Sequence, residues 1–412
     1  MPGGPLMFVR KQFAAIMALS VVFALVVAGC GSDPTATPRP APTATAVPEP
    51  TATPLPPGVP TPTPRPATPT PAPTPTPTFD GDAYFEGKTI RVITGTSPGG
   101  GYDTFSRLVS AAAERHFPRS TKFVVQNLPG AGQYRGLRSV LDAKPDGFTV
   151  GPVHSRWFQR EAIMGDVPLF DLDAVYMLGS PTFSISDDAL CVDRSVATSW
   201  EEVLALGRPL KTGETGPGNR PAEEFLQSIG APIEMVYGYG GTSEIMAAFD
   251  RGEFDATDRC SDAVVPRLYP EWATDRRLVP LFYENMPYSA EWLKTIGFER
   301  DTYPRFSELP GLNATKAQLD AVAANIAAAE LSRVFILPEG VPAEVQADWQ
   351  RRFDDIMVDE QFIERLAIAG YADDYGYGTS EDLYGVINQM RGLDDATRAQ
   401  MLELSGVGNL VI

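Results

Sequence analysis

The chain has 412 residues, with 34 lysines and arginines against 52 aspartates and glutamates, and a formal net charge of −18. A chain this acidic offers no basic stripe to a phosphate backbone, so we expect no nucleic-acid partner. It has only two histidines and three cysteines. Because they form no ligand cluster in the sequence, we expect no metal site and no cofactor.

The first 29 residues have the layout of a signal peptide. Arg10 and Lys11 precede an uncharged run over residues 12–29, which is shorter than the roughly 20 residues of a comfortable spanning helix. The run ends in Val27-Ala28-Gly29-Cys30, which resembles a bacterial lipobox. We therefore expect cleavage before Cys30 and a lipid on that residue. An ordinary signal peptide or a single membrane anchor is the alternative.

Residues 30–78 are dominated by threonine and proline. A segment with almost no large apolar side chain cannot bury a core, and its prolines favour extended polyproline II. We expect a disordered linker that holds the following domain away from the membrane.

Strand-like and helix-like segments alternate through residues 79–412, which we assign to one folded domain. The predicted strands are 89–94, 122–126, 149–153, 175–178, 190–192, 210–212 and 233–236, and the predicted helices are 104–117, 133–141, 199–206, 221–229 and 243–251. Such alternation predicts an α/β fold of two doubly wound lobes with a cleft between them. We place lobe 1 at about 85–185 plus returning C-terminal segments, and lobe 2 at about 186–310. Residues 314–404 are expected to be mostly helical, and 410–412 to be a late strand or a tail.

Two glycine-rich turns in lobe 1 each join a predicted strand to a predicted helix. They are Ser97-Pro98-Gly99-Gly100-Gly101-Tyr102-Asp103 and Asn127-Leu128-Pro129-Gly130-Ala131-Gly132. Turns of this kind place backbone N–H groups at helix N-termini, which suits an anion. Neither turn carries the lysine of a phosphate-binding loop, so we expect a carboxylate rather than a nucleotide. Asp103 either caps its helix or orients a group of the ligand.

Lobe 2 supplies a third glycine-rich turn, residues 212–220. Thr215 and Asn219 can donate hydrogen bonds there, and Arg220 either pairs with a ligand carboxylate or forms a surface salt bridge. Tyr237 begins a further turn, and its ring either forms part of the wall of the ligand site or packs at the hinge.

The cysteines and the absence of a recognisable catalytic motif in the sequence bear on the class of protein. Cys191 and Cys260 fall in the same predicted lobe, and in an exported protein they form a disulfide or remain thiols. His154 and Ser155 are adjacent in what we expect to be a strand, which would turn their side chains to opposite faces. We therefore expect a protein that is not an enzyme.

Three motifs of lobe 1 follow one another in a characteristic order. They are Pro98-Gly99-Gly100-Gly101-Tyr102-Asp103 with Arg107, Asn127-Leu128-Pro129-Gly130-Ala131-Gly132, and Ala143-Lys144-Pro145-Asp146-Gly147-Phe148-Thr149. In order and spacing, this part of the chain resembles the substrate-binding receptors of tripartite tricarboxylate transporters. The turn at residues 237–241 and the motif at 251–255 are similar to the second-lobe signature of that family, more loosely.

The resemblance implies a type II periplasmic-binding-protein fold with a two-stranded hinge that closes on a ligand. Carried over to this chain, the ligand contacts would come from Pro98, Gly99, Gly100 and Gly101, and from Gly130, Ala131, Gly132 and Gln133, with Asp103 nearby. The chain departs from the family at Gln133-Tyr134-Arg135-Gly136, where Gly-Asn-Ile-Gly is usual, and at Asn219-Arg220, where a serine and a histidine are usual. These differences leave the ligand's identity open.

From these observations we expect a monomeric, extracytoplasmic, lipid-anchored receptor for a small organic carboxylate. The resemblance implies delivery of that ligand to a membrane permease made of one large and one small subunit. A sensor or scavenger that presents the same ligand without serving a transporter is the alternative.

Overall fold

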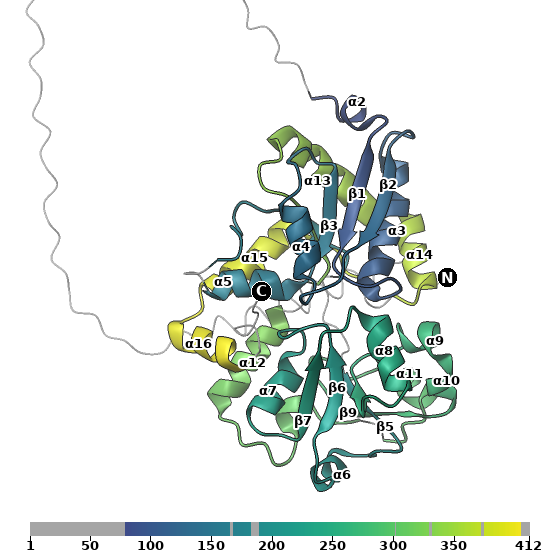
Figure 1. Cartoon of the computed structure of the whole chain (residues 1–412), viewed down its shortest axis with the longest axis vertical. Helices are drawn as coiled ribbons and strands as arrows, with labels where there is room; N and C mark the ends of the chain where they lie inside the picture. The colour runs from purple at the N-terminus through teal and green to yellow at the C-terminus, as the bar shows by residue number, and fades with distance from the viewer. Residues whose placement is uncertain are drawn as a thin grey trace, which may run out of the picture. The chain divides into compact units, whose positions relative to one another are not determined.

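The computed structural model describes residues 79–164, 168–182, 189–300, 302–328, 332–371 and 375–404. The signal peptide, Cys30, the linker and residues 410–412 lie outside the described residues. Residues Phe79–Ile412 form one compact unit, and Figure 1 shows its two lobes, each built around a sheet. No helix in the described part of the chain is long and apolar enough to cross a bilayer.

Lobe 1 contains a six-stranded sheet in the order β11–β4–β10–β3–β1–β2. In that order the strands are Gly378–Thr379, Tyr176–Ser180, Val334–Leu337, Thr149–Val153, Thr89–Thr94 and Lys122–Asn127. β1 runs parallel to β2 and β3, whereas β10 is antiparallel to β3 and β4. Every residue of β3 and β10 is buried, as expected for central strands that are covered on both faces.

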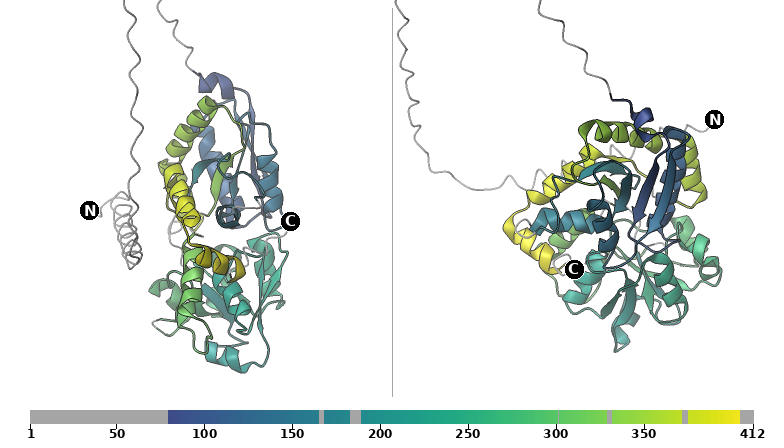
Figure 2. Two further views of the ribbon diagram at one scale, coloured as in Figure 1. Left: turned by 90° about the vertical axis from the view of Figure 1, so that its left-hand side faces the viewer. Right: turned by 45° about the horizontal axis from the view of Figure 1, so that its top comes forward.

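Helices cover both faces of this sheet (Figure 2). On one side lie α2 (Gly81–Phe85), α3 (Gly101–His116), α13 (Ala343–Met357) and α14 (Glu360–Ile368). On the other side lie α4 (Tyr134–Leu141), α5 (Ser155–Met164) and α15 (Ser380–Arg391). The helical spacing of Phe105, Val109 and Ala112 places all three in the core beneath α3.

Lobe 2 contains a five-stranded sheet in the order β7–β6–β8–β5–β9. In that order the strands are Ile233–Tyr237, Leu210–Glu214, Ala256–Thr257, Ala189–Asp193 and Leu278–Tyr283. β6 is parallel to β7 and β8, and β5 is antiparallel to β8 and β9. The Cys191–Cys260 disulfide joins β5 to the segment after β8, with 6.3 Å between the Cα atoms.

The helical elements of lobe 2 share one hydrophobic core with its sheet. They are α6 (Trp200–Ala205), α7 (Pro221–Ser228), α8 (Thr242–Asp250), α9 (Val265–Leu268), α10 (Pro270–Thr274), α11 (Ala290–Thr295), a 3-10 turn (Phe306–Glu308) and α12 (Lys316–Ala328). Because Val322 and Ile326 of α12 lie in this core, lobe 2 extends beyond residue 310.

The chain passes between the lobes more than once. It leaves lobe 1 after β4, enters lobe 2 at β5, and returns to lobe 1 at β10. Thr182 and Ser332, which flank these two crossings, pair as an antiparallel bridge, and the Thr182 hydroxyl donates to the Ser332 carbonyl at 3.0 Å. The last helix, α16 (Asp395–Leu404), packs against α12 and α7 (Figure 1).

The two doubly wound lobes predicted from the sequence are confirmed, with two differences. Residues 314–404 are mostly helical, as expected, but they also contain Val334–Leu337, which forms the antiparallel strand β10 in the middle of the lobe 1 sheet. A four-residue apolar run carries no periodicity that separates a buried strand from a buried helix. His154 and Ser155 are not within a strand but follow β3 at the start of α5, where the Ser155 hydroxyl lies 3.3 Å from His154 Nδ1.

Candidate functional site

A cavity of about 190 Å³ lies between the two lobes. Lobe 1 contributes the start of α3, Gln133, His154 and Arg333, and lobe 2 contributes the turn after β6 and residues that follow β8. Several of these turns follow the carboxyl ends of parallel strands, where α/β sheets place their ligands. The cavity is smaller than the roughly 300–1,000 Å³ of a drug-sized pocket, so it suits a small solute.

The lobes also contact each other directly around this cavity. The Ser97 N–H donates to the Gly240 carbonyl at 2.8 Å, and Arg267 Nη1 donates to the Gly99 carbonyl at 2.8 Å. Arg156 Nη1 donates to the Gly216 carbonyl at 3.2 Å. The structure is therefore a closed arrangement of the lobes.

The first glycine turn presents the N-terminus of α3 to the cavity. Gly100 is the N-cap, and Gly100 and Gly101 line the cavity. Helix geometry leaves the first N–H groups of α3 without intrahelical acceptors, and no side chain caps the helix there. This end of α3 is accordingly a site of positive potential.

Asp103 holds this turn together and does not line the cavity. Its carboxylate accepts from the Gly99 N–H at 2.9 Å, from Asn127 Nδ2 at 2.9 Å and from Arg107 Nε at 3.0 Å. Burial works to raise the pKa of Asp103, but these hydrogen bonds outweigh it and keep the pKa below its ordinary value. Of the two roles that we predicted, the structure assigns Asp103 to organising the helix start.

The second glycine turn has a backbone that most residues avoid. Gly130, Ala131, Gly132 and Gln133 all have positive φ, at 131°, 47°, 57° and 73°. Gln133 is the N-cap of α4 and lines the cavity, whereas the three residues before it line an adjoining hollow of about 500 Å³. A Cβ at position 132 would lie 2.7 Å from Arg156 Nη2, so glycine there allows the guanidinium to reach the Gly132 carbonyl.

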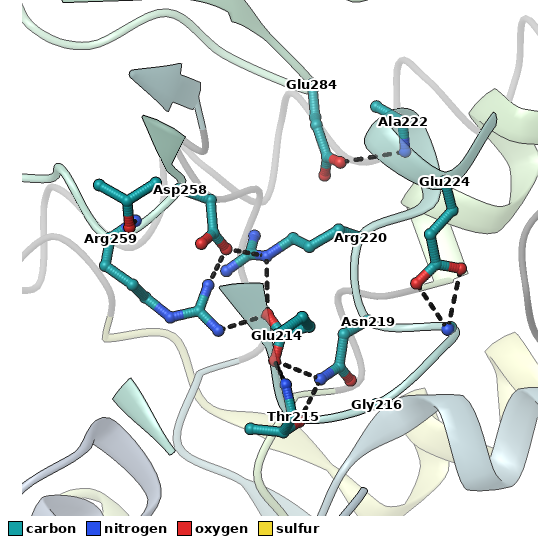
Figure 3. Close-up of polar contacts among 12 residues, drawn as sticks. Glu214, Thr215, Gly216, Asn219, Arg220, Ala222, Glu224, Asp258, Arg259 and Glu284 are labelled. Carbon is teal, nitrogen blue, oxygen red and sulfur yellow. Dashed lines mark hydrogen bonds and ion pairs between the residues drawn. The ribbon is translucent and has the colours of Figure 1, made fainter. Parts of the chain in front are cut away.

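The lobe 2 wall is a buried network of acids and arginines, drawn in Figure 3. Glu214, at the end of β6, accepts from Arg259 Nη2 at 2.5 Å and lies 3.6 Å from Arg220 Nε. It also accepts from Asn219 Nδ2 at 2.7 Å and from the Thr215 N–H at 2.5 Å. Asp258 forms ion pairs with both Arg220 and Arg259. Burial disfavours the charge on Glu214, but the two arginines and these hydrogen bonds lower its pKa well below the ordinary value.

Two further buried glutamates near this wall have raised pKa values. Burial and the neighbouring Glu284 raise the pKa of Glu223 well above its ordinary value. Burial raises the pKa of Glu224 to about 8, although its carboxyl group accepts from the Gly218 N–H at 2.8 Å. Both shifts have the sign expected when a carboxylate is buried without a cationic partner close enough to offset its desolvation.

We expect Glu224→Gln to flatten the pH dependence of folding. Because the pKa of Glu224 is raised in the folded state, the unfolded chain binds fewer protons, and wild-type stability falls as the pH rises from about 4.5 to about 8. The advantage of the variant should grow over this range by about 1 kcal/mol per pH unit and then level off. Urea denaturation from pH 4 to 9 measures it, with the exposed Glu253→Gln as control. Parallel profiles for wild type and Glu224→Gln would contradict the assignment.

The structure brings most of the predicted site residues to one region. Six of them line the cavity: Gly100, Gly101, Gln133, Thr215, Asn219 and Arg220. Four line the adjoining hollow: Gly130, Ala131, Gly132 and Tyr237. Pro98, Gly99 and Asp103 line neither. The Pro98 carbonyl accepts from the Ser243 hydroxyl at 3.3 Å, and both backbone groups of Gly99 are bound within the protein.

Arg220 lies in the buried network rather than in a surface salt bridge, so the surface alternative is wrong. Sequence reasoning missed Glu214, Asp258, Arg259 and Arg333. The pair Asp258-Arg259 directly follows the short strand β8, and a charged pair at the end of an apolar strand could have pointed to it. Arg333 precedes β10, a strand that was not predicted, and no motif in the sequence near it indicated a role in the site.

No metal-binding group of three or more histidine, cysteine or acidic side chains occurs among the described residues. The acids of the lobe 2 wall that carry charge are paired with arginines, and what the wall offers a ligand is hydrogen bonding and charge.

No protein-family model matches the chain, and no curated protein matches it. Several solved structures do match the chain. The periplasmic binding protein BugD is 15% identical with a TM-score of 0.53, over 78% of this chain and 98% of that one. A Rhodopseudomonas palustris protein solved with adipate is 16% identical with a TM-score of 0.51, over 76% and 97%. MatC from Rhodopseudomonas palustris with bound malate is 14% identical with a TM-score of 0.50, over 76% and 99%. These likenesses and the sheet topology show that the chain has the two-lobed α/β fold of periplasmic binding proteins.

Proposed function

We propose that this protein is an extracytoplasmic solute-binding receptor that captures a small organic carboxylate between its lobes. The observation that carries the proposal is the closed cavity, into which the N-terminus of α3 and an arginine from the lobe-crossing segment both face. Two proteins of the same fold were solved with adipate and with malate, which supports a carboxylate as the ligand class. The proposed activity is binding and release without chemical change in the ligand, so we propose a protein that is not an enzyme.

The receptor would hand its ligand to a tripartite tricarboxylate-type transporter. This part of the proposal rests on the three lobe 1 motifs between Pro98 and Thr149. The lipobox-like Cys30 and the Thr/Pro-rich residues after it support a lipid anchor with a long spacer. A monomer on such a tether could close on a ligand and reach the permease.

Binding can be tested with a thermal-shift screen of the full chain in mild detergent. The panel is acetate, succinate, malate, adipate, citrate and benzoate, each beside its uncharged amide. A carboxylate ligand at about 100 times its Kd should add about 2.7 kcal/mol to the free energy of unfolding, because it binds only the folded state. The amides should add much less. If no acid in the panel raises the melting temperature, the proposal fails.

A further inference from the structure

Arg333 differs from the other arginines that line the cavity. Arg220 and Arg259 pair with Glu214 and Asp258. In the described part of the chain, Arg333 forms no ion pair with a carboxylate, and its buried Nε has no hydrogen-bond partner. Its guanidinium lies instead over aromatic rings, 4.6 Å from the centroid of Phe105 and 5.5 Å from that of Tyr102.

The backbone at Arg333 supports a functional role. It has φ of 56°, a left-handed conformation that costs energy in a residue with a side chain. Such strain persists where the surrounding structure enforces it and is concentrated at binding sites. Arg333 immediately precedes β10 and follows Ser332, which pairs with Thr182 where the chain crosses between the lobes. Its position is therefore fixed by the crossing itself.

The guanidinium of Arg333 reaches the N-terminus of α3. A Cβ at position 101 would lie 2.9 Å from Arg333 Nη2, so glycine at this position leaves room for the side chain. Two positive groups, the helix N-terminus and the guanidinium, thus share one end of the cavity. In the first turn of α3, the carboxylate of Asp103 is bound to Gly99, Asn127 and Arg107, and it does not line the cavity.

The lobe 2 wall already pairs its own charges. Its acids Glu214 and Asp258 form ion pairs with Arg220 and Arg259, and Glu284 also lines the cavity. Two buried oxygens on the cavity lining, Gln133 Oε1 and Asn219 Oδ1, have no donor among the residues that the structure describes. The Asn219 amide is held in this orientation because its Nδ2 donates to Glu214 and to Thr215. Because the lobe 2 arginines already have acidic partners and these two oxygens require hydrogen-bond donors, the Arg333 end is the place for an anion.

We infer that Arg333 is the counter-ion of the ligand's carboxylate, which it binds together with the first-turn N–H groups of α3. This inference rests on the proposed function. The guanidinium lies over the rings of Phe105 and Tyr102, and the N–H groups of a guanidinium lie in its own plane, where a carboxylate can accept from two of them. The remainder of the ligand then extends toward Gln133 and Asn219, where hydrogen-bond donors are favoured.

The test is a thermodynamic cycle on the full chain in detergent. Isothermal titration calorimetry measures wild type, Arg333→Gln and Arg333→Lys with the acid of the panel that gives the largest thermal shift, and with the amide of that acid. Arg333→Gln should weaken binding of the acid by roughly 10- to 100-fold, the effect of losing a charged hydrogen bond. Binding of the amide should change much less. Arg333→Lys keeps the charge and should retain part of the affinity.

Arg300→Gln is the matched control, because Arg300 also lies over an aromatic ring, 5.0 Å from the centroid of Phe298, but is exposed on the surface of lobe 2. It should leave both affinities unchanged. If Arg333→Gln alters neither affinity, or weakens acid and amide equally, the inference is wrong while the proposed function stands. If wild type binds no acid of the panel, the proposed function itself fails, and the inference with it.

Discussion

Glu214→Gln should lower the free energy of unfolding by about 3–5 kcal/mol, the usual cost of breaking a buried ion pair from one side. Glutamine has nearly the same shape and can still accept from the Thr215 N–H. It removes a charged partner from Arg259 and Arg220, which Glu214 now contacts at 2.5 and 3.6 Å and which both also pair with Asp258. Each guanidinium group would then lose a buried carboxylate that now balances its charge. Urea denaturation at pH 7 measures the difference from wild type.

The sign of the pH effect separates this electrostatic cause from a packing defect. The folded-state pKa of Glu214 is lowered, so its contribution is complete above its ordinary pKa near 4.5 and is lost as the pH falls further. The difference between wild type and Glu214→Gln should shrink below pH 4.5. Glu253→Gln, which removes an exposed ion pair to Arg251 at 2.7 Å, is the control and should cost less than about 1 kcal/mol. A loss at Glu214 as small as that of the control would contradict the role assigned to the network.

Removal of the disulfide with the double variant Cys191→Ala/Cys260→Ala should cost about 4 kcal/mol. The bond closes a loop across a sequence separation of 69 residues, and a cross-link of that span reduces the conformational entropy of the unfolded chain by roughly this amount. Both cysteines are fully buried in the lobe 2 core. The measurement is urea denaturation with and without a reductant.

The reductant serves as the internal control. It should lower the stability of wild type toward that of the double variant and leave the double variant unaffected. Because the network and the disulfide both belong to lobe 2, the lobe 1 motifs should be unaffected by either change. A double variant within about 1 kcal/mol of wild type would mean that the disulfide adds little to the stability of this lobe.

The strands and helices that build the site could be predicted well from local features of the sequence. β1 and β3 have the predicted bounds, because runs of β-branched residues between turn-forming residues identify a strand locally. The two glycine turns were recognised for the same reason. Glycine at positive φ, as at Gly99 and Gly130, is a requirement of the local backbone and does not depend on distant residues.

The charged half of the site could not be predicted in this way. Glu214 and Arg259 are 45 positions apart in sequence and meet only because β6 and β8 are neighbours in the sheet. Arg220 had two open interpretations, and the choice between them depended on Asp258, which the turn motif does not contain. Asp103 was likewise ambiguous until its contact with Asn127 of β2 was known.

The sequence by itself therefore determined the α/β class, the two lobes and the backbone turns that face the cavity, since periodicity and glycine act over a few neighbouring residues. Only the tertiary structure decided the electrostatics of the cavity. In the folded protein the chain returns to lobe 1 at β10, and Arg333 therefore lies beside the N-terminus of α3. The tertiary structure also buries the acids of lobe 2 against two arginines. Charge and burial depend on which distant segments meet, and that is a property of the fold rather than of any local motif.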